Sequence, residues 1–155
     1  MMQRCNRIYN HPIFQERLQE IEEKEKDRIF CLHNFAHALD VARIGYIMIL
    51  DEKADIDKEL FYAAALLHDA GRYSGKPHNE SGAELARLVM PECGFDECET
   101  ELVSASILCH RTSGKTGEFA QILYTADKKS RNCFRCKVEK ECYWEQEKRN
   151  LVIEI

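Results

Sequence analysis

The chain has 155 residues, of which 45% are hydrophobic and 32% are charged, and its net charge is −5 at pH 7. This length predicts a single compact unit with its own core, and the apolar content excludes a disordered chain. The acidic balance disfavours nucleic acid as a partner. Seven glycines and three prolines favour long helices over a turn-rich β-sandwich.

The first residues lack the apolar stretch of a signal peptide. The longest apolar runs, at 44–50 and 62–67, fall well short of the roughly 18 residues of a membrane span. We therefore expect a cytoplasmic protein with no membrane partner. In that reducing compartment the eight cysteines are expected to be thiols or metal ligands rather than disulfides.

In chain order, the apolar spacing predicts a first helix from Pro12, whose end lies in the charge run 20–28. We expect this charge run to be solvated. A second helix is predicted over residues 34–50. A third follows a cap at Asp55 or Asp57 and runs to about Asp69, where Gly71 would end it.

Further helices are predicted at about 80–90, ending before Pro91, at 97–110, and from Glu118 onward. No segment shows convincing strand alternation. The pattern therefore predicts an all-α fold, a single helical bundle that carries a Cys-rich C-terminal extension.

Histidines and aspartates recur where facing helices of a bundle could present them to one centre. His33 and His37 share a helical face, whereas His68 and Asp69 are neighbours at the expected helix end. The remaining candidates are His78, His110 and Asp127. Imidazole with carboxylate suits Fe, Mn, Zn or similar divalent ions. A single histidine on an apolar face is more often a hydrogen-bonded core residue, so spacing alone leaves the joint metal site open.

Three segments together resemble the HD-domain metallophosphohydrolase superfamily, whose signature is H…HD…D. They are FAHALDVAR at 35–43, AAALLHDAGR at 63–72 and YTADK at 124–128. The signature positions are His37, His68, Asp69 and Asp127, and the resemblance extends over roughly residues 28–132. It implies an HD-type helical bundle that binds a divalent metal ion.

Two more segments narrow the resemblance to members with two metal ions, such as HD-type dinucleoside-tetraphosphate hydrolases. They are HNESGAELA, which begins at His78, and ILCH, which ends at His110 and is followed by Gly114. The resemblance implies that His78 and His110 hold a second ion and that Asp69 bridges the two. It implies a metal-dependent phosphohydrolase that attacks a small phosphate ester or nucleotide with a metal-activated water.

Other residues near the signature have more than one interpretation. As the bridging ligand, Asp69 would also orient the attacking water. Arg72 lies one turn beyond His68 and either clamps a phosphate oxygen or interacts with the helix dipole. His33 is a candidate extra ligand, substrate contact or donor to a ligand. Lys128 is a candidate phosphate contact, with surface solvation as the alternative.

The C-terminal residues break the helical pattern and concentrate cysteine. Cys133, Cys136 and Cys142 are three soft ligands at short spacing, which suggests zinc or an Fe–S cluster. Both usually need a fourth ligand, for which Cys5, Cys31 and His11 are candidates; the alternative is a set of thiols packed as small apolar groups. We predict a metal-binding helical domain at 1–132 and a Cys-rich extension at 133–155 that packs on it.

Two other functions stay open at this point. Some HD-fold proteins with a similar ligand set are di-iron oxidoreductases, and a non-catalytic metal or redox sensor would also use a Cys-rich tail. The phosphohydrolase hypothesis predicts a small phosphorylated substrate as the partner. No sequence feature indicates an oligomeric state.

Overall fold

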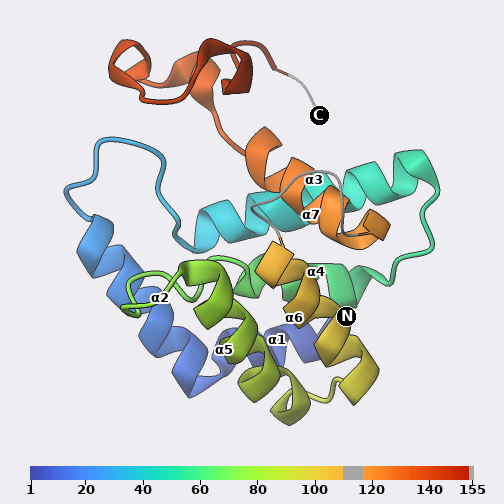
Figure 1. Ribbon diagram of the computed structural model, residues 1–155. Coiled ribbons are helices and arrows are strands. Elements are labelled where there is room, and N and C mark those ends of the chain that lie inside the picture. Colours follow the sequence, from blue (N-terminus) through green and yellow to red (C-terminus); the bar gives the residue numbers. More distant parts are fainter. Residues whose placement is uncertain (110–116, 154–155) are drawn as a thin grey trace.

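The computed structural model describes residues 1–109 and 117–153 (Figure 1). Within these ranges the chain forms seven α-helices and three short 3-10 helices and contains no strand, which confirms the predicted all-α fold. The α-helices are α1 (Gln3–Asn10), α2 (Pro12–Glu25), α3 (Phe35–Glu52), α4 (Lys58–Leu67), α5 (His78–Glu92), α6 (Glu97–Cys109) and α7 (Gly117–Lys129).

Helix α4 lies at the centre of the bundle. Every residue from Leu60 to Leu67 is buried, and the helix contacts α1, α3, α5, α6 and α7. Full burial of a large apolar side chain contributes about 1.5–3 kcal/mol, so side chains such as Phe61 and Leu67 hold α4 firmly in place. The segment that follows α4 therefore leaves the core from a fixed point.

Two polar side chains fix where the central helices begin. The Asn34 side-chain oxygen accepts from the His37 backbone N–H at 3.1 Å and caps α3. The Asp57 carboxylate accepts from the Leu60 backbone N–H at 2.9 Å and caps α4, so Asp57 rather than Asp55 is the cap. Each cap contributes about 1 kcal/mol, and the first places His37 in the opening turn of α3.

Gly71 does not end the helix, as predicted, but lies in the turn beyond it. The α4 helix ends at Leu67, and the turn through Gly71 passes directly against the start of α5. A Cβ at Gly71 would lie 2.3 Å from the Gly82 backbone nitrogen and 2.4 Å from the His78 carbonyl oxygen. Only glycine allows this approach, which brings the turn after α4 next to His78.

The structure differs from the predicted elements in three places. Helix α1 was not predicted, because its apolar residues are few; Arg4 holds it by pairing with Glu59 at 3.0 Å and Glu99 at 2.7 Å. The charged residues at the end of α2 were expected to be solvated, and this prediction is wrong for Glu25, whose side chain is buried. Helix α5 does not end before Pro91 but includes it in its last turn.

After α7 the chain changes character. Residues 131–153 form the 3-10 helices η1 (Cys133–Arg135), η2 (Glu139–Glu141) and η3 (Gln146–Lys148), joined by loops. Figure 1 shows this segment in red, standing off the helical body beyond α7. In the described parts of the chain, no helix is long and apolar enough to cross a membrane.

Candidate metal centre

Four elements deliver the candidate ligands to one place. His37 lies in the first turn of α3, His68 caps the C-terminus of α4, and Asp69 follows it in the turn. Asp127 lies near the end of α7, and His78 is the first residue of α5. Neighbours on a regular helix point about 100° apart. His68 and Asp69 can reach one centre because α4 ends at Leu67, so both residues lie in the turn that follows the helix.

The possible ligand atoms of four of these residues lie close together: His37, His68, Asp69 and Asp127. His37 Nε2 lies 3.6 Å from Asp69 Oδ2 and 3.5 Å from Asp127 Oδ1. His68 Nε2 lies 3.3 Å from Asp69 Oδ2 and 4.0 Å from Asp127 Oδ1. Among the described residues, one possible ligand atom from each of His37, His68 and Asp69 forms a group in which all three atoms lie within 4.8 Å of one another.

These separations fit a metal ion. With metal–ligand bonds of about 2.1 Å, neighbouring ligands lie about 3.0 Å apart in an octahedron and about 3.4 Å apart in a tetrahedron. All four distances are longer than the usual 2.7–3.2 Å of an N–H···O hydrogen bond, and the three of 3.3, 3.5 and 3.6 Å are close to this ligand spacing. The His-His-Asp cluster could therefore hold a divalent ion.

Hydrogen bonds at the other imidazole nitrogens orient both rings. His68 Nδ1 lies 2.7 Å from the Ala65 carbonyl oxygen and donates to it. The Ser130 hydroxyl donates to the Asp127 carbonyl oxygen at 2.8 Å, so it accepts from His37 Nδ1, 3.2 Å away. With Nδ1 protonated in both rings, both Nε2 lone pairs are directed at the aspartates, which is the arrangement that metal-binding histidines use.

Asp69 offers its second oxygen to another group of side chains. His78 Nε2 lies 3.5 Å from Asp69 Oδ1, and Arg72 Nη1 lies 3.6 Å from the same atom. The Asp69 carboxylate thus lies between the His37–His68 pair and His78. This geometry permits a bridging role, although His110, the other predicted ligand of a second ion, lies outside the described residues.

The histidines and carboxylates shift one another's pKa values strongly. Burial lowers the pKa of His37, but its interactions with the ionised Asp127 and Asp69 outweigh burial and raise this pKa to about 9. Burial raises the pKa of Asp69, yet His68 and His37 bring it well below its usual value. The Asp127 pKa is lowered against its burial by His37, His68 and Lys128. Both carboxylates are therefore ionised, as metal ligation requires.

The cluster opens into a cavity of about 420 Å³ that is rich in positive charge. Four cationic side chains line it together with the candidate ligands: Arg28, Arg72, Lys128 and Arg131. Lys128 pairs with Asp127, and Arg72 is held between Asp69 and Glu25. Tyr143 and Trp144 of the tail form the aromatic part of the wall. Such a cavity suits an anionic ligand.

Glu25 connects the two loops beside the cluster and was missed in the sequence. Its carboxylate accepts from His33 Nδ1 and from the His33 backbone N–H, both at 2.7 Å, and from the Tyr73 hydroxyl at 2.9 Å. Arg72 Nε lies 3.5 Å away. The surrounding run of charged residues, typical of a solvated face, gives no signal that this carboxylate alone turns inward.

His33 lies beside the cluster without joining it. Its ring centroid is 5.7 Å from that of His37, and it lines the cavity. Because Nδ1 donates to Glu25, the other ring nitrogen is the one available as an acceptor. Burial lowers the pKa of His33, which favours the neutral ring.

The comparisons with known proteins agree with this geometry. The HD domain family matches residues 34–132, the range that contains His37, His68, Asp69, His78 and Asp127. The chain belongs to the HD domain family. It is also 28% identical to a solved structure described as a predicted HD superfamily hydrolase from an uncultured Thermotogales bacterium. That match has a TM-score of 0.63 and covers 90% of this chain and 78% of the other.

Two proteins that are similar in sequence differ in how much of their length matches this chain. A Clostridium beijerinckii protein described as uncharacterized is 40% identical over 98% of this chain and 99% of its own length. A bifunctional uridylyltransferase/uridylyl-removing enzyme of Gluconobacter oxydans is 41% identical over 77 residues. The latter match covers 50% of this chain and 8% of the enzyme, so it concerns one region of a much longer protein.

Proposed function

We propose that this protein is a metal-dependent phosphohydrolase whose substrate is a small phosphate ester or a nucleotide. The observation that carries the proposal is the convergence of two imidazoles and two carboxylates at a cavity that four cationic side chains line. A carboxylate cluster alone would repel a phosphate. The cations Arg28, Arg72, Lys128 and Arg131 supply the attraction that the substrate needs.

In this proposal His37, His68, Asp69 and Asp127 hold one divalent ion of Fe, Mn, Zn or a similar metal. His78 and Asp69 Oδ1 contribute to a second ion, for which His110 remains the predicted further ligand. When bound, such ions lower the pKa of a coordinated water toward neutrality and offset the charge that develops on a phosphoryl group.

The protein's own residues then bind and orient the reactants. Asp69 is the catalytic carboxylate, because both of its oxygens face donor groups and either can accept a hydrogen bond from the attacking water. Arg72 is the second catalytic residue. Its guanidinium is held by Asp69 and Glu25, at 3.6 and 3.5 Å, and its remaining N–H groups can bind a phosphate oxygen.

Lys128 and His33 complete the proposed substrate contacts. Lys128 pairs with Asp127 but also lies 5.1 Å from the Tyr124 ring, at the edge of the cavity. His33 can present Nε2 to a substrate hydroxyl, since Glu25 holds its Nδ1. Both residues line the same cavity as His78.

The aromatic wall favours a nucleotide among the small phosphate esters. Tyr143 and Trp144 stack with centroids 5.8 Å apart, and the Arg131 guanidinium lies 4.2 Å from the Trp144 centroid. A base can stack on such a platform, at about 1–3 kcal/mol per base. In this account residues 133–155 form an extension that completes the substrate cavity of the domain at 1–132.

The relatives support the same chemistry. The structural neighbour is described as a hydrolase, and the Gluconobacter enzyme's name includes removal of a uridylyl group, which is a nucleotide unit. We further propose a cytoplasmic protein, because none of its eight cysteines forms a disulfide and a reducing compartment would keep them reduced.

The test is a phosphate-release screen. Protein stripped of metal and reloaded with Mn²⁺, Fe²⁺ or Zn²⁺ is incubated with nucleotides and simple phosphate esters, and inorganic phosphate is measured. His37→Ala should abolish turnover. His11→Ala is the matched control, because His11 pairs with Glu92 at 3.1 Å and lies outside the cavity lining.

Arg72→Ala tests the anion-binding part of the proposal. It should raise KM and lower kcat, whereas Arg87→Ala should change neither, because Arg87 pairs with the exposed Glu101. Phosphate release that is equal in wild type and in His37→Ala would refute the proposal. Dioxygen-dependent turnover without phosphate release would favour an oxidoreductase instead.

A further inference from the structure

The C-terminal segment, residues 131–153, keeps a defined shape without a core of its own. None of its three 3-10 helices contains a buried residue, and each has three residues. Segments this short rarely hold a fixed conformation by apolar burial, and they usually depend on a disulfide or a metal. None of the eight cysteines forms a disulfide, so a disulfide does not supply the constraint.

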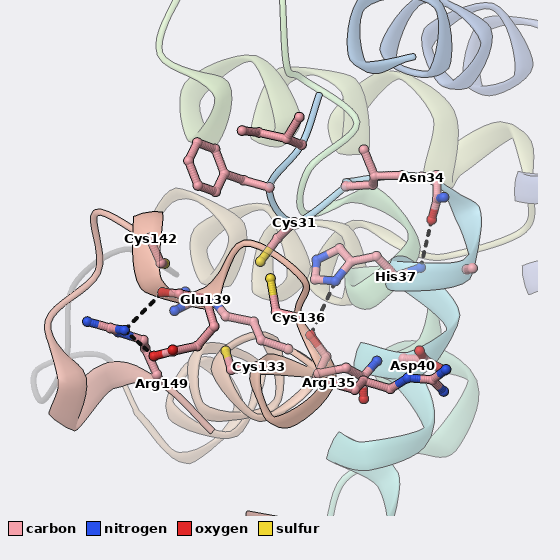
Figure 2. Close-up of a pocket in the computed structure, with 17 residues that line it drawn as sticks. Cys31, Asn34, His37, Asp40, Cys133, Arg135, Cys136, Glu139, Cys142 and Arg149 are labelled. Carbon is pink, nitrogen blue, oxygen red and sulfur yellow. Dashed lines mark hydrogen bonds and ion pairs between the residues drawn. The ribbon is translucent and has the colours of Figure 1, made fainter. Parts of the chain in front are cut away.

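Four of those thiols surround one cavity. Cys31, from the loop between α2 and α3, and Cys133, Cys136 and Cys142, from the tail, all line a space of about 450 Å³. Figure 2 shows the Cys31 and Cys136 sulfurs directed toward one another across this space, with Cys133 and Cys142 at its margin. Among the candidates for a fourth ligand, the structure thus brings Cys31 to the tail cysteines.

Independent contacts hold the loop and the tail in this arrangement. The Phe30 and Tyr143 rings meet edge to face at 5.5 Å, and the Arg28 guanidinium donates to the Cys31 carbonyl at 2.8 Å. The Asn150 side chain donates to the carbonyls of Lys128, Lys129 and Arg131 at 2.8, 3.1 and 2.9 Å, which anchors the tail to the end of α7. The approach of Cys31 is therefore part of a consistent interface.

The spacing of the sulfurs does not match a single tetrahedral ion. In a tetrahedral zinc site with Zn–S bonds of about 2.3 Å, the sulfurs lie about 3.8 Å apart. All four cysteines belong to the described residues, yet no three of their sulfurs come within 4.8 Å of one another, unlike the donors of His37, His68 and Asp69. A cluster of several irons and sulfides fills a wider space between four thiolates than a single ion does.

The local charge also suits bound thiolates. Arg131, Arg135 and Arg149 line the same cavity, against the two carboxylates of Asp40 and Glu139. Arg149 is paired with Glu139, which leaves Arg131 and Arg135 to offset negative charge at the sulfurs. Burial and the three tail thiols raise the pKa of Cys31, whereas Arg131 lowers it.

We propose that Cys31, Cys133, Cys136 and Cys142 bind an iron–sulfur cluster of the 4Fe–4S type, which fastens the C-terminal tail to the α2–α3 loop. The site is separate from the histidine centre but adjacent to it, since His37 and Cys31 line both cavities. By fixing the tail, the cluster also positions Tyr143, Trp144 and Arg131 as a wall of the substrate cavity.

The experiment measures acid-labile sulfide, which the histidine centre does not contain. The full chain is isolated without oxygen from iron-fed cells, and iron, zinc and sulfide are determined per chain. The proposal predicts about four sulfides per chain in the wild type. It predicts the same sulfide content in His37→Ala, so failure of the histidine centre is distinguishable from failure of this site.

Cys31→Ser and, separately, Cys136→Ser should lose the sulfide and the visible absorption of the cluster. Cys98→Ser is the matched control, since this exposed thiol lies on α6 away from the cavity, and it should keep both. Limited proteolysis should cut the tail of the two cluster variants and leave the α-helical body intact. Zinc without sulfide in the wild type, or undiminished sulfide in Cys31→Ser, would overturn the proposal.

Discussion

Ser130→Ala isolates the part of the metal centre that orients a ligand without touching the ion. The Ser130 hydroxyl accepts from His37 Nδ1 at 3.2 Å and donates to the Asp127 carbonyl at 2.8 Å, so it ties one ligand to the backbone of another. Without it, His37 loses the hydrogen bond that keeps Nδ1 protonated and Nε2 available. Partners of this kind typically change metal affinity 10–100-fold, or about 1.4–2.7 kcal/mol.

The assay is a Mn²⁺ titration of the metal-stripped protein, because Mn²⁺ prefers nitrogen and oxygen donors and avoids the tail thiols. Ser104→Ala is a matched control. Its hydroxyl is buried and donates to the Thr100 carbonyl at 2.7 Å on α6, a helix that carries none of His37, His68, Asp69 and Asp127. Both variants lose a serine hydrogen bond to a backbone carbonyl, of about 0.5–1.5 kcal/mol, but only Ser130→Ala should weaken Mn²⁺ binding. Equal Mn²⁺ affinity in the two variants would refute the reasoning.

Three further predictions concern pH and packing. In the metal-free protein, the pKa of His37 is about 9, above the value of 6.5 in the unfolded chain. Protonated His37 should therefore stabilise the folded state fully below pH 6.5, and this stabilisation should be lost as the pH rises toward 9. Because the ion must displace this proton, Mn²⁺ affinity should rise about tenfold per pH unit between pH 7 and 8, and a pH-independent affinity would contradict the assignment. Contacts with His33 and Tyr73 lower the pKa of Glu25 despite its burial, so its stabilisation should be present above pH 4.5 and fall away in acid. Glu25→Gln should weaken that acid dependence in urea unfolding and lower stability near pH 7 by about 1.5–3 kcal/mol, whereas an unchanged profile would place the carboxylate in solvent. Gly71→Ala should destabilise the fold by about 1–3 kcal/mol, because the added Cβ would meet the backbone of Gly82 and His78. If this variant were as stable as the wild type in urea unfolding, the turn would have to be able to move.

The sequence predicts the helices that carry the ligands because their signals are local. Asn34 and Asp57 are caps next to apolar runs, and the spacing within each run determines which side chains face inward. His37, His68 and Asp127 could be singled out on that basis. Their convergence could not, because it depends on how α3, α4 and α7 pack together.

The residues that local patterns missed depend on contacts between distant segments. Glu25 stands in a run of charged side chains and is buried only because His33 and Tyr73 from two later loops bind it. Helix α1 is held by Arg4 pairing with residues 55 and 95 positions away. Cys31 was one of three possible partners for the tail cysteines, and only the fold selects it.

The most direct test of the central claim is to follow phosphate release while metal is returned to the stripped protein. The rate should be negligible without metal and should rise in proportion to the occupancy of the site defined by His37, His68, Asp69 and Asp127. In His68→Ala it should stay negligible at every metal concentration. Phosphate release at the full rate by the metal-free protein, or by His68→Ala, would contradict the account.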